Sequence, residues 1–199
     1  MSLETNFRMI FIALLLIALS VSAYYRTKAR RSSPERISRR EEGIALLVTL
    51  RLGGLALMAS VLAYAIHPTW MAWGTLPLPV WVRWLGVLGG LISIPLVVWM
   101  FRSLGNNVTD TVVTRREHSL VTHGPYRFIR HPLYTFGALF YFSLSLIASS
   151  WWIALLSGLA LVLLAQRTPI EEAKLIERFG DDYSQYMHRT GRFFPKLSG

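Results

Sequence analysis

Apolar residues gather into blocks long enough to cross a lipid bilayer, which takes about 20 residues of helix. Three blocks have this length: residues 7–25, Ile44–Ile66 and 80–101. The third is interrupted by Pro95. A fourth run, residues 133–166, contains no Lys, Arg, Asp or Glu and is too long for one ordinary span. We expect it to divide at residues 149–152 into a tight hairpin of two helices of about 16 residues each. The pattern predicts an all-α integral membrane protein with about five transmembrane helices.

The rest of the chain is polar and lies between or after these blocks. Residues 1–102 carry the first three spans, and residues 103–199 carry a long polar loop, the hairpin and a charged tail. Within the polar loops, residues 32–35 are predicted to begin a helix and residues 108–113 to form a short extended stretch. No internal repeat and no linker long enough to separate two domains is visible. We therefore expect a single membrane domain over residues 1–199.

The charged tail is predicted to be helical. Thr168 is expected to cap a new helix with Pro169 in its first turn, where a backbone N–H is not needed. Apolar and charged positions then recur with a helical period up to Gly180, which is expected to break the helix. Residues 183–188 are predicted to form a further short helix. The tail thus adds a C-terminal helical region outside the membrane.

Basic residues are concentrated in three polar segments. Of the 21 Lys and Arg, seven lie within residues 26–40, five within 102–130 and six within 167–196, whereas residues 67–79 contain none. Because basic loops stay on the cytoplasmic side of a membrane, the distribution predicts an outside N-terminus and a cytoplasmic C-terminal region. The basic cluster follows the first apolar block, so we expect an uncleaved anchor and not a signal peptide. The tryptophans expected at the outer membrane surface are Trp70, Trp73, Trp81, Trp84, Trp151 and Trp152.

Composition and motif content argue against several functional classes. The net charge of +10 follows the membrane loops, and no stacking platform or recognition helix accompanies it, so no nucleic-acid partner is expected. The absence of Cys excludes disulfides, thiolate zinc sites and cysteine nucleophiles. No P-loop, G-x-S-x-G or G-x-G-x-x-G occurs. No carboxylate stands at ligand spacing from His123 and His131, so no metal site is expected either.

The densest group of reactive side chains lies directly before the fourth apolar run. Residues 123–134 read H-G-P-Y-R-F-I-R-H-P-L-Y, with two each of His, Arg, Tyr and Pro. Polar groups beside a membrane segment are costly to bury unless they bind something. The stretch therefore indicates a charged pocket at the membrane face. The alternative is that Arg127 and Arg130 bind lipid phosphate and that His123 and His131 cap helix ends.

A second candidate group follows the hairpin. Arg167 ends the apolar run, and Glu171 and Glu172 come four and five residues later. Taken alone, Arg167 is explained by snorkelling to the membrane surface, and the two carboxylates by the positive end of a helix. Their shared location with residues 123–134 on the predicted cytoplasmic side favours a joint site.

Two further arginines lie within predicted spans. Arg83 is near the expected outer surface and is predicted to snorkel. Arg51 lies about two turns from the cytoplasmic side, where it could pair with an acid on that side. Whether Arg51 takes part in the site is left open by the sequence.

Three motifs occur in order along the C-terminal two fifths of the chain. They are residues 120–134, the segment Arg167-x-x-x-Glu171-Glu172, and residues 179–195, which contain F-G-D-D-Y-x-x-Y and end in G-R-F-F-P. Together they resemble the isoprenylcysteine carboxyl methyltransferase family, within the wider phospholipid methyltransferase group, as a short member of prokaryotic type. The first hundred residues share only their apolar helices with that family.

The resemblance implies an enzyme that transfers a methyl group from S-adenosyl-L-methionine, leaving S-adenosyl-L-homocysteine, to a lipophilic acceptor in the bilayer. The reaction that it implies is carboxyl O-methylation of an isoprenylcysteine-like small molecule or prenylated substrate. By this resemblance, Arg167 would hold the acceptor carboxylate and Glu171 would order Arg167 or the cofactor. The cofactor-binding residues that it implies are Leu120, His123, Gly124, Tyr126, His131, Tyr134 and Glu172.

Three alternatives remain beside this function. The acceptor is a phospholipid amine or another small amine, in which case Glu171 would take its proton. A reductase similar to membrane sterol reductases would use a nicotinamide dinucleotide phosphate, but the short chain with five spans disfavours it. A membrane scaffold without enzymatic activity would tolerate substitution of Arg167 and Glu171.

Overall fold

The computed structural model describes residues 2–32, 44–105 and 119–196. All of the expected extended stretch at 108–113, and all but the first residue of the expected helix start at 32–35, lie outside these ranges. The elements are α1 (Leu3–Ser32), α2 (Ile44–Ile66), the 3₁₀ helix η2 (Pro68–Gly74), α3 (Val80–Leu104), the 3₁₀ helix η4 (Gly124–Arg127), α4 (Pro132–Ile147), α5 (Trp151–Phe179) and α6 (Asp181–Arg189).

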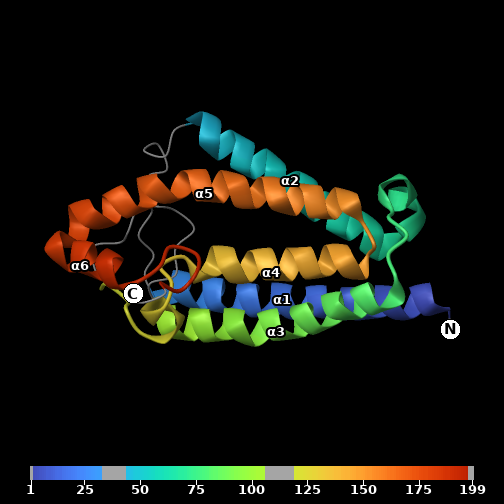
Figure 1. Cartoon of the computed structure of the whole chain (residues 1–199), viewed down its shortest axis with the longest axis horizontal. Helices are drawn as coiled ribbons and strands as arrows, with labels where there is room; N and C mark the ends of the chain where they lie inside the picture. The colour runs from blue at the N-terminus through green and yellow to red at the C-terminus, as the bar shows by residue number, and fades with distance from the viewer. Residues whose placement is uncertain (1, 33–43, 106–118, 197–199) are drawn as a thin grey trace.

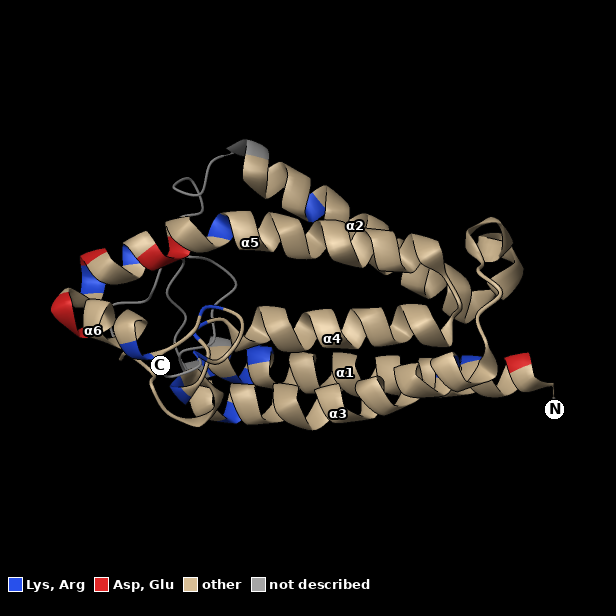
Figure 2. Ribbon diagram, in the orientation of Figure 1, with Lys and Arg blue, Asp and Glu red and all other residues tan. Residues whose placement is uncertain are grey.

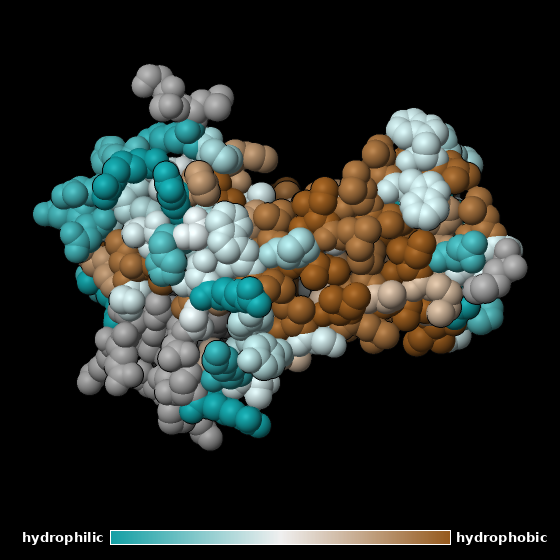
Figure 3. Space-filling view, turned by 90° about the horizontal axis from the view of Figure 1, so that it is seen from below, coloured by the Kyte–Doolittle hydropathy of each residue, from teal (hydrophilic) through white to brown (hydrophobic). Residues whose placement is uncertain are grey.

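The described chain is an apolar helical bundle, as the hydropathy pattern predicts. α1, α2, α3 and α5 are each long and apolar enough to cross a membrane, and α4 is a shorter apolar helix of 16 residues. The two chain ends lie at opposite ends of the bundle, with α6 beside the C-terminus (Figure 1). Apolar side chains cover the length of the helices, and polar ones gather at the α6 end (Figure 3). The all-α integral membrane fold and the hairpin of α4 and α5 are therefore confirmed.

The hairpin turns at the two serines where the sequence predicted a break. Ser149 adopts a positive φ of 51°, and the Ser150 side chain accepts a hydrogen bond from the Ile153 backbone N–H at the start of α5. α4 then packs along α3, so closely that a Cβ at Gly86 would lie 2.8 Å from the Ser143 carbonyl oxygen. This contact fixes α4, which carries one side of the site described below.

Two prolines do not interrupt helices in the way the sequence suggested. α3 runs through Pro95, and α5 continues without a break through Pro169, so Thr168 is not the cap of a new helix. Thr168 is fully buried, and its hydroxyl donates to the Leu164 carbonyl oxygen inside the same helix (3.0 Å). Proline removes only one backbone donor, and packing of the adjacent turn keeps the helix intact. The C-terminal helix predicted after the membrane is therefore the end of α5, while the break at Gly180 and the short helix α6 are confirmed.

Arg83 does not snorkel, in contrast to the prediction. Its side chain is buried, donates to the Ile147 carbonyl oxygen (3.0 Å) and forms a two-pronged ion pair with Glu4 of α1. The guanidinium also lies 4.1 Å from the ring centre of Phe7. Glu4 lies far away along the sequence, so the pattern around Arg83 gave no sign of this partner. The arginine joins α3 to the first turn of α1 and to the last residue of α4.

Replacing Arg83 by Met should lower the unfolding temperature in detergent, because the Ile147 carbonyl and Glu4 both lose their partner. A buried acceptor left without a donor costs about 1–3 kcal/mol. Each kcal/mol corresponds to roughly 2–4 °C in a protein of this size. Glu4→Gln should have a smaller effect, because Arg83 keeps its contact with Ile147. Arg102→Met, at an exposed arginine near the end of α3, is the matched control; equal melting of Arg83→Met and wild type would contradict the role of this contact.

Candidate active site

A cavity of about 540 Å³ lies between α2, α4 and α5, with Arg26 of α1 on one side. Most of its wall is apolar or small: Leu47, Leu50, Gly53, Gly54, Leu57, Leu133, Gly137, Ala138, Ala160, Leu161, Leu163 and Leu164. A Cβ added at Gly54 or Gly137 would meet no atom within 4 Å, so both glycines border open space. The dimensions and lining suit the apolar part of a lipid-like molecule.

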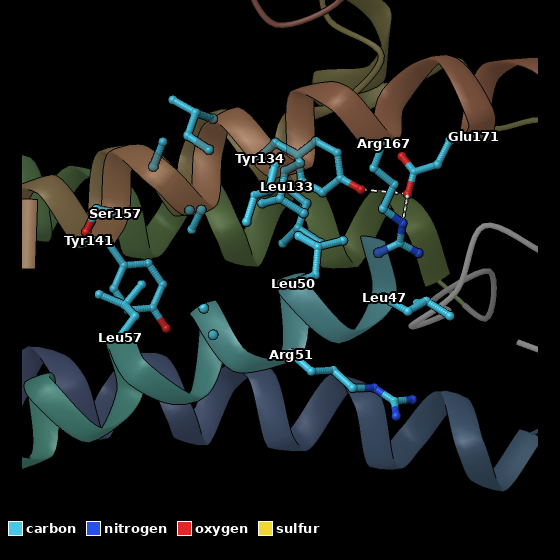
Figure 4. Close-up of a pocket in the computed structure, with 18 of the residues that line it drawn as sticks. Leu47, Leu50, Arg51, Leu57, Leu133, Tyr134, Tyr141, Ser157, Arg167 and Glu171 are labelled. Atoms are coloured by element: carbon cyan, nitrogen blue, oxygen red, sulfur yellow. Dashed lines mark hydrogen bonds and ion pairs between the residues drawn. The ribbon is translucent and has the colours of Figure 1, made fainter. Parts of the chain in front are cut away.

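The charged lining is concentrated at one end of this cavity. Arg167 and Glu171 project from α5 there, and Tyr134 reaches the same point from the first turn of α4 (Figure 4). Tyr141 and Ser157 line the opposite end. An apolar chamber with a polar end is the expected shape of a site for an amphiphile that enters from the bilayer.

Glu171 receives contacts from three neighbouring side chains at the polar end. The Tyr134 hydroxyl donates to Glu171 Oε1 at 2.6 Å, and Arg167 Nε lies 3.3 Å from the same oxygen. His131 Nδ1 lies 3.4 Å from Glu171 Oε2. Arg167 and Glu171 are four residues apart on one helix face, so the helix itself sets their contact. The arrangement brings both predicted catalytic residues together with two predicted cofactor-binding residues.

Glu172 lies behind this group and is buried. Arg130 Nε donates to its Oε1 at 2.8 Å, and Arg192 Nη2 donates to its Oε2 at 2.5 Å. His131 Nε2 lies 3.3 Å from Oε1, so the imidazole stands between the two carboxylates. A buried carboxylate is tolerated where basic partners compensate its loss of hydration. Glu172 therefore holds the segments around the cavity together.

Two opposing effects set the charge of His131. Burial disfavours the imidazolium, but the carboxylates of Glu171 and Glu172 favour it more strongly, so the pKa of His131 lies above its ordinary value. The ring also lies nearly parallel to that of Tyr134, at 5.5 Å between centres. His131 and the two carboxylates thus form one contiguous group at the head of α4.

The segment before α4 is held in place by the C-terminal tail. The Arg130 and His131 backbone N–H groups donate to the carbonyl oxygens of Gly191 and Arg192, at 2.9 and 3.1 Å. The Gly191 N–H returns a bond to the Phe128 carbonyl oxygen at 3.2 Å. A Cβ at residue 191 would lie 1.7 Å from the Phe194 carbonyl oxygen, so only glycine fits. The motif G-R-F-F-P therefore closes the site through its backbone.

The other predicted cofactor-binding residues lie further from the cavity. Tyr126 is in η4, where its carbonyl oxygen accepts a 2.7 Å bond from the hydroxyl of buried Tyr186, and burial raises the pKa of Tyr186 to about 12. Gly124 has a φ of +62°, and a Cβ there would lie 2.0 Å from Ser103 Oγ of α3. Leu120 is half-buried and His123 is exposed. None of these four lines the cavity, and their binding roles stay predictions.

Two functional contacts were missed by the sequence analysis. Arg130 was interpreted only as a possible lipid-phosphate ligand, and Arg192 was quoted in a motif without a role. Both bind Glu172, from opposite sides in the sequence. No sequence pattern links them to Glu172, because Arg130 precedes it by 42 residues and Arg192 follows it by 20.

Replacing Gly191 by Ala should displace the tail from residues 128–131, because the added methyl group collides with the Phe194 carbonyl. We expect a lower unfolding temperature and faster proteolysis after residue 190, with the apolar helices intact by circular dichroism. Gly105→Ala is a useful comparison, since it has a positive φ but open space around its Cβ. An unchanged cleavage pattern in Gly191→Ala would rule out this packing.

Stability should fall as the pH rises above the ordinary His pKa of about 6.5. The raised pKa of His131 means that its stabilising charge is fully present below that value and is lost as the pH passes the folded-state pKa. Melting temperatures of wild type and His131→Asn, measured from about pH 6 to 9, test this. The difference between the two proteins should shrink toward high pH; a constant difference would contradict it.

Comparison with known proteins places this site within a known family. The model of the phospholipid methyltransferase family matches residues 81–182, which is half of the chain and includes both carboxylates and His131. The chain is 32% identical over 84 residues to cobalt-zinc-cadmium resistance protein CzcN of Cupriavidus metallidurans, covering 42% of this chain and 39% of that protein. It is 32% identical over 96 residues to protein-S-isoprenylcysteine O-methyltransferase of Schizosaccharomyces pombe, covering 47% and 41%. The matches thus span about two fifths of the length of these relatives.

A solved structure supports the fold over nearly the whole chain. The eukaryotic intramembrane Ras methyltransferase, isoprenylcysteine carboxyl methyltransferase, superposes with a TM-score of 0.59 at 20% identity. The superposition covers 96% of this chain and 69% of that one. At 20% identity this likeness shows a shared fold. Membership of the family rests on the sequence match to the family model. The chain therefore belongs to the phospholipid methyltransferase family.

Proposed function

We propose that this protein is an S-adenosyl-L-methionine-dependent methyltransferase acting on a lipophilic acceptor in the bilayer, most directly by carboxyl O-methylation of an isoprenylcysteine-like compound. The observation that carries the proposal is the junction of Tyr134, Arg167 and Glu171 at the polar end of an apolar cavity. This junction lies within the segment shared with the family. Two relatives named protein-S-isoprenylcysteine O-methyltransferase match 47% and 48% of this chain.

The residues around Glu171 fit the chemistry of S-adenosyl-L-methionine. A carboxylate suits the ammonium group of that cofactor, and the ring of Tyr134, which lines the cavity, suits an adenine or a sulfonium. The cofactor would supply an electrophilic methyl group. Glu172, whose partners are Arg130, Arg192 and His131, would act by positioning the imidazole.

Arg167 is the residue best placed to hold an acceptor carboxylate. Its guanidinium lines the cavity from α5 and can bind a carboxylate through two parallel hydrogen bonds. Glu171 keeps this side chain oriented through their 3.3 Å contact, and Tyr134 orients Glu171 in turn. The role of these residues is therefore placement of the reacting oxygen, which supplies a large part of many rate enhancements.

No strong base is required for methylation of a carboxylate, which is already ionised at neutral pH. The apolar walls would contribute by keeping water away from the reacting atoms. If the acceptor is a phospholipid amine, Glu171 is the group that would take its proton. The family name and the available carboxylate make amine methylation the second candidate.

The charge distribution supports a definite orientation in the membrane. Most Lys and Arg of the described chain gather at the end that holds α6 and the site, opposite the N-terminus (Figure 2). We propose that this end faces the cytoplasm and that the N-terminus lies outside. The cofactor would then enter from the cytoplasm and the acceptor from the surrounding lipids.

Arg167→Ala and Glu171→Gln should each reduce methyl transfer by about a hundredfold or more, because the acceptor is no longer placed. The measurement is transfer of labelled methyl from S-adenosyl-L-methionine to N-acetyl-S-farnesylcysteine by the detergent-solubilised protein. Affinity for S-adenosyl-L-homocysteine, measured by calorimetry, should change much less in Arg167→Ala. His131→Ala should weaken that affinity directly.

Glu177→Gln is the matched control, because Glu177 is exposed further along α5. It should leave transfer and binding unchanged. Phosphatidylethanolamine is the acceptor that tests amine methylation, and reduced nicotinamide dinucleotide phosphate is the ligand that tests the reductase alternative. Binding of the nicotinamide cofactor without S-adenosyl-L-homocysteine would overturn the proposed function.

A further inference from the structure

The half of α2 beside the polar end of the cavity is not packed into the bundle. Buried side chains on α2 begin at Leu57, and none of the described side chains in residues 46–56 is buried. The other half is held firmly: Arg8 donates to the carbonyl oxygens that end α2, and the Trp152 indole N–H donates to Ser60 Oγ. This half of α2, residues 46–56, is called the loose half below; it contributes no side chain to the buried core.

Arg51 is the charged residue of this loose half. It lines the cavity, is exposed and makes no ion pair with another described residue. A charge within an apolar span is unfavourable, and such residues are found where they serve a polar pathway or a ligand. In Figure 4 its side chain extends toward the same end of the cavity as Arg167 and Glu171.

The described residues that line the cavity include more arginines than carboxylates. Three helices each contribute one arginine to the lining, Arg26 from α1, Arg51 from α2 and Arg167 from α5, whereas Glu171 is the one described lining carboxylate. Glu171 is already shared between Tyr134, His131 and Arg167. An amphiphile that fills the cavity removes water from Arg51, which has no ion pair with a described residue, so an anionic end group is favoured and a cationic one is disfavoured.

We propose that Arg51 is a specificity-determining residue that binds the anionic end of the acceptor and selects acids over amines and neutral lipids. This deepens the proposed function and rests on it for the identity of the ligand as an acceptor. The role is distinct from that of Arg167, which is oriented on α5 by Glu171. Arg51 adds a contact from the opposite wall, on a helix segment that packing leaves accessible.

The test compares two probes with one tail, N-acetyl-S-farnesylcysteine and its uncharged carboxamide. Equilibrium binding of each to the solubilised full chain is measured with saturating S-adenosyl-L-homocysteine. Wild type should prefer the acid by at least about tenfold, the effect of one charge-assisted contact. Arg51→Leu should lose most of this preference by weakening the acid alone, and Arg51→Lys should restore part of it.

Arg102→Leu is the control for removal of an exposed arginine, because Arg102 lies outside the cavity lining. S-adenosyl-L-homocysteine affinity reports whether the site of each variant is intact. An acid preference that survives in Arg51→Leu would show that Arg51 only snorkels, and would overturn the proposal. Equal binding of the two probes by wild type would also overturn it. If wild type does not bind S-adenosyl-L-homocysteine, the proposed function itself is rejected. The two failures are distinguishable because cofactor binding and probe binding are measured separately.

Discussion

The buried carboxylate of Glu172 is the interaction on which the arrangement of the site depends. Removing a carboxylate from water is strongly unfavourable unless its oxygens receive charged hydrogen-bond donors. Here those donors come from Arg130 and His131 before α4 and from Arg192 in the tail. The Glu172 carboxylate on α5 is therefore fully compensated only when the segment before α4 and the C-terminal tail both lie against it. A loop, a membrane helix and the C-terminal tail are thus fixed relative to one another.

The neighbouring carboxylate, Glu171, is part of the cavity wall and not of the buried contacts behind it. Successive residues on an α-helix point about 100° apart, so Glu171 faces the cavity while Glu172 faces Arg130 and Arg192 behind it. His131 contacts both carboxylates and thereby links the buried Glu172 to the residues that line the cavity. Glu171 in turn holds Arg167 one turn earlier. The carboxylate that lines the cavity is in this way positioned by one that is buried behind it.

The membrane imposes the second feature of the site. Because lipid is as apolar as a protein core, a helix half can remain beside the bundle without being packed into it. The loose half of α2 lies beside the bundle in this way and borders a cavity that has charged residues at one end and apolar residues along its wall. Under the proposed function, a charged cofactor and a lipid-like acceptor would meet at one point, although they come from different phases.

Much of the fold follows from local sequence properties. The bounds of α2, the hairpin of α4 and α5, and the end of α5 at Gly180 were predicted, because hydropathy and turn chemistry act over a few residues. The pairing of Arg167 with Glu171 was also within reach, since a spacing of four residues on a helix sets that contact. The predictions that were wrong concern residues that are compatible with more than one local structure. Pro169 was read as a helix start, but the packing of buried Thr168 carries α5 through it.

The sequence by itself therefore determined the membrane class, the helices and the two segments that carry the candidate chemistry. Only the tertiary structure decided which charges face the cavity and which support it. Arg83 is joined to Glu4, and Glu172 to Arg192, by the way distant segments return to one another. Hydropathy cannot distinguish these partners, because an arginine that snorkels and one that is buried in an ion pair occupy the same kind of position along an apolar helix.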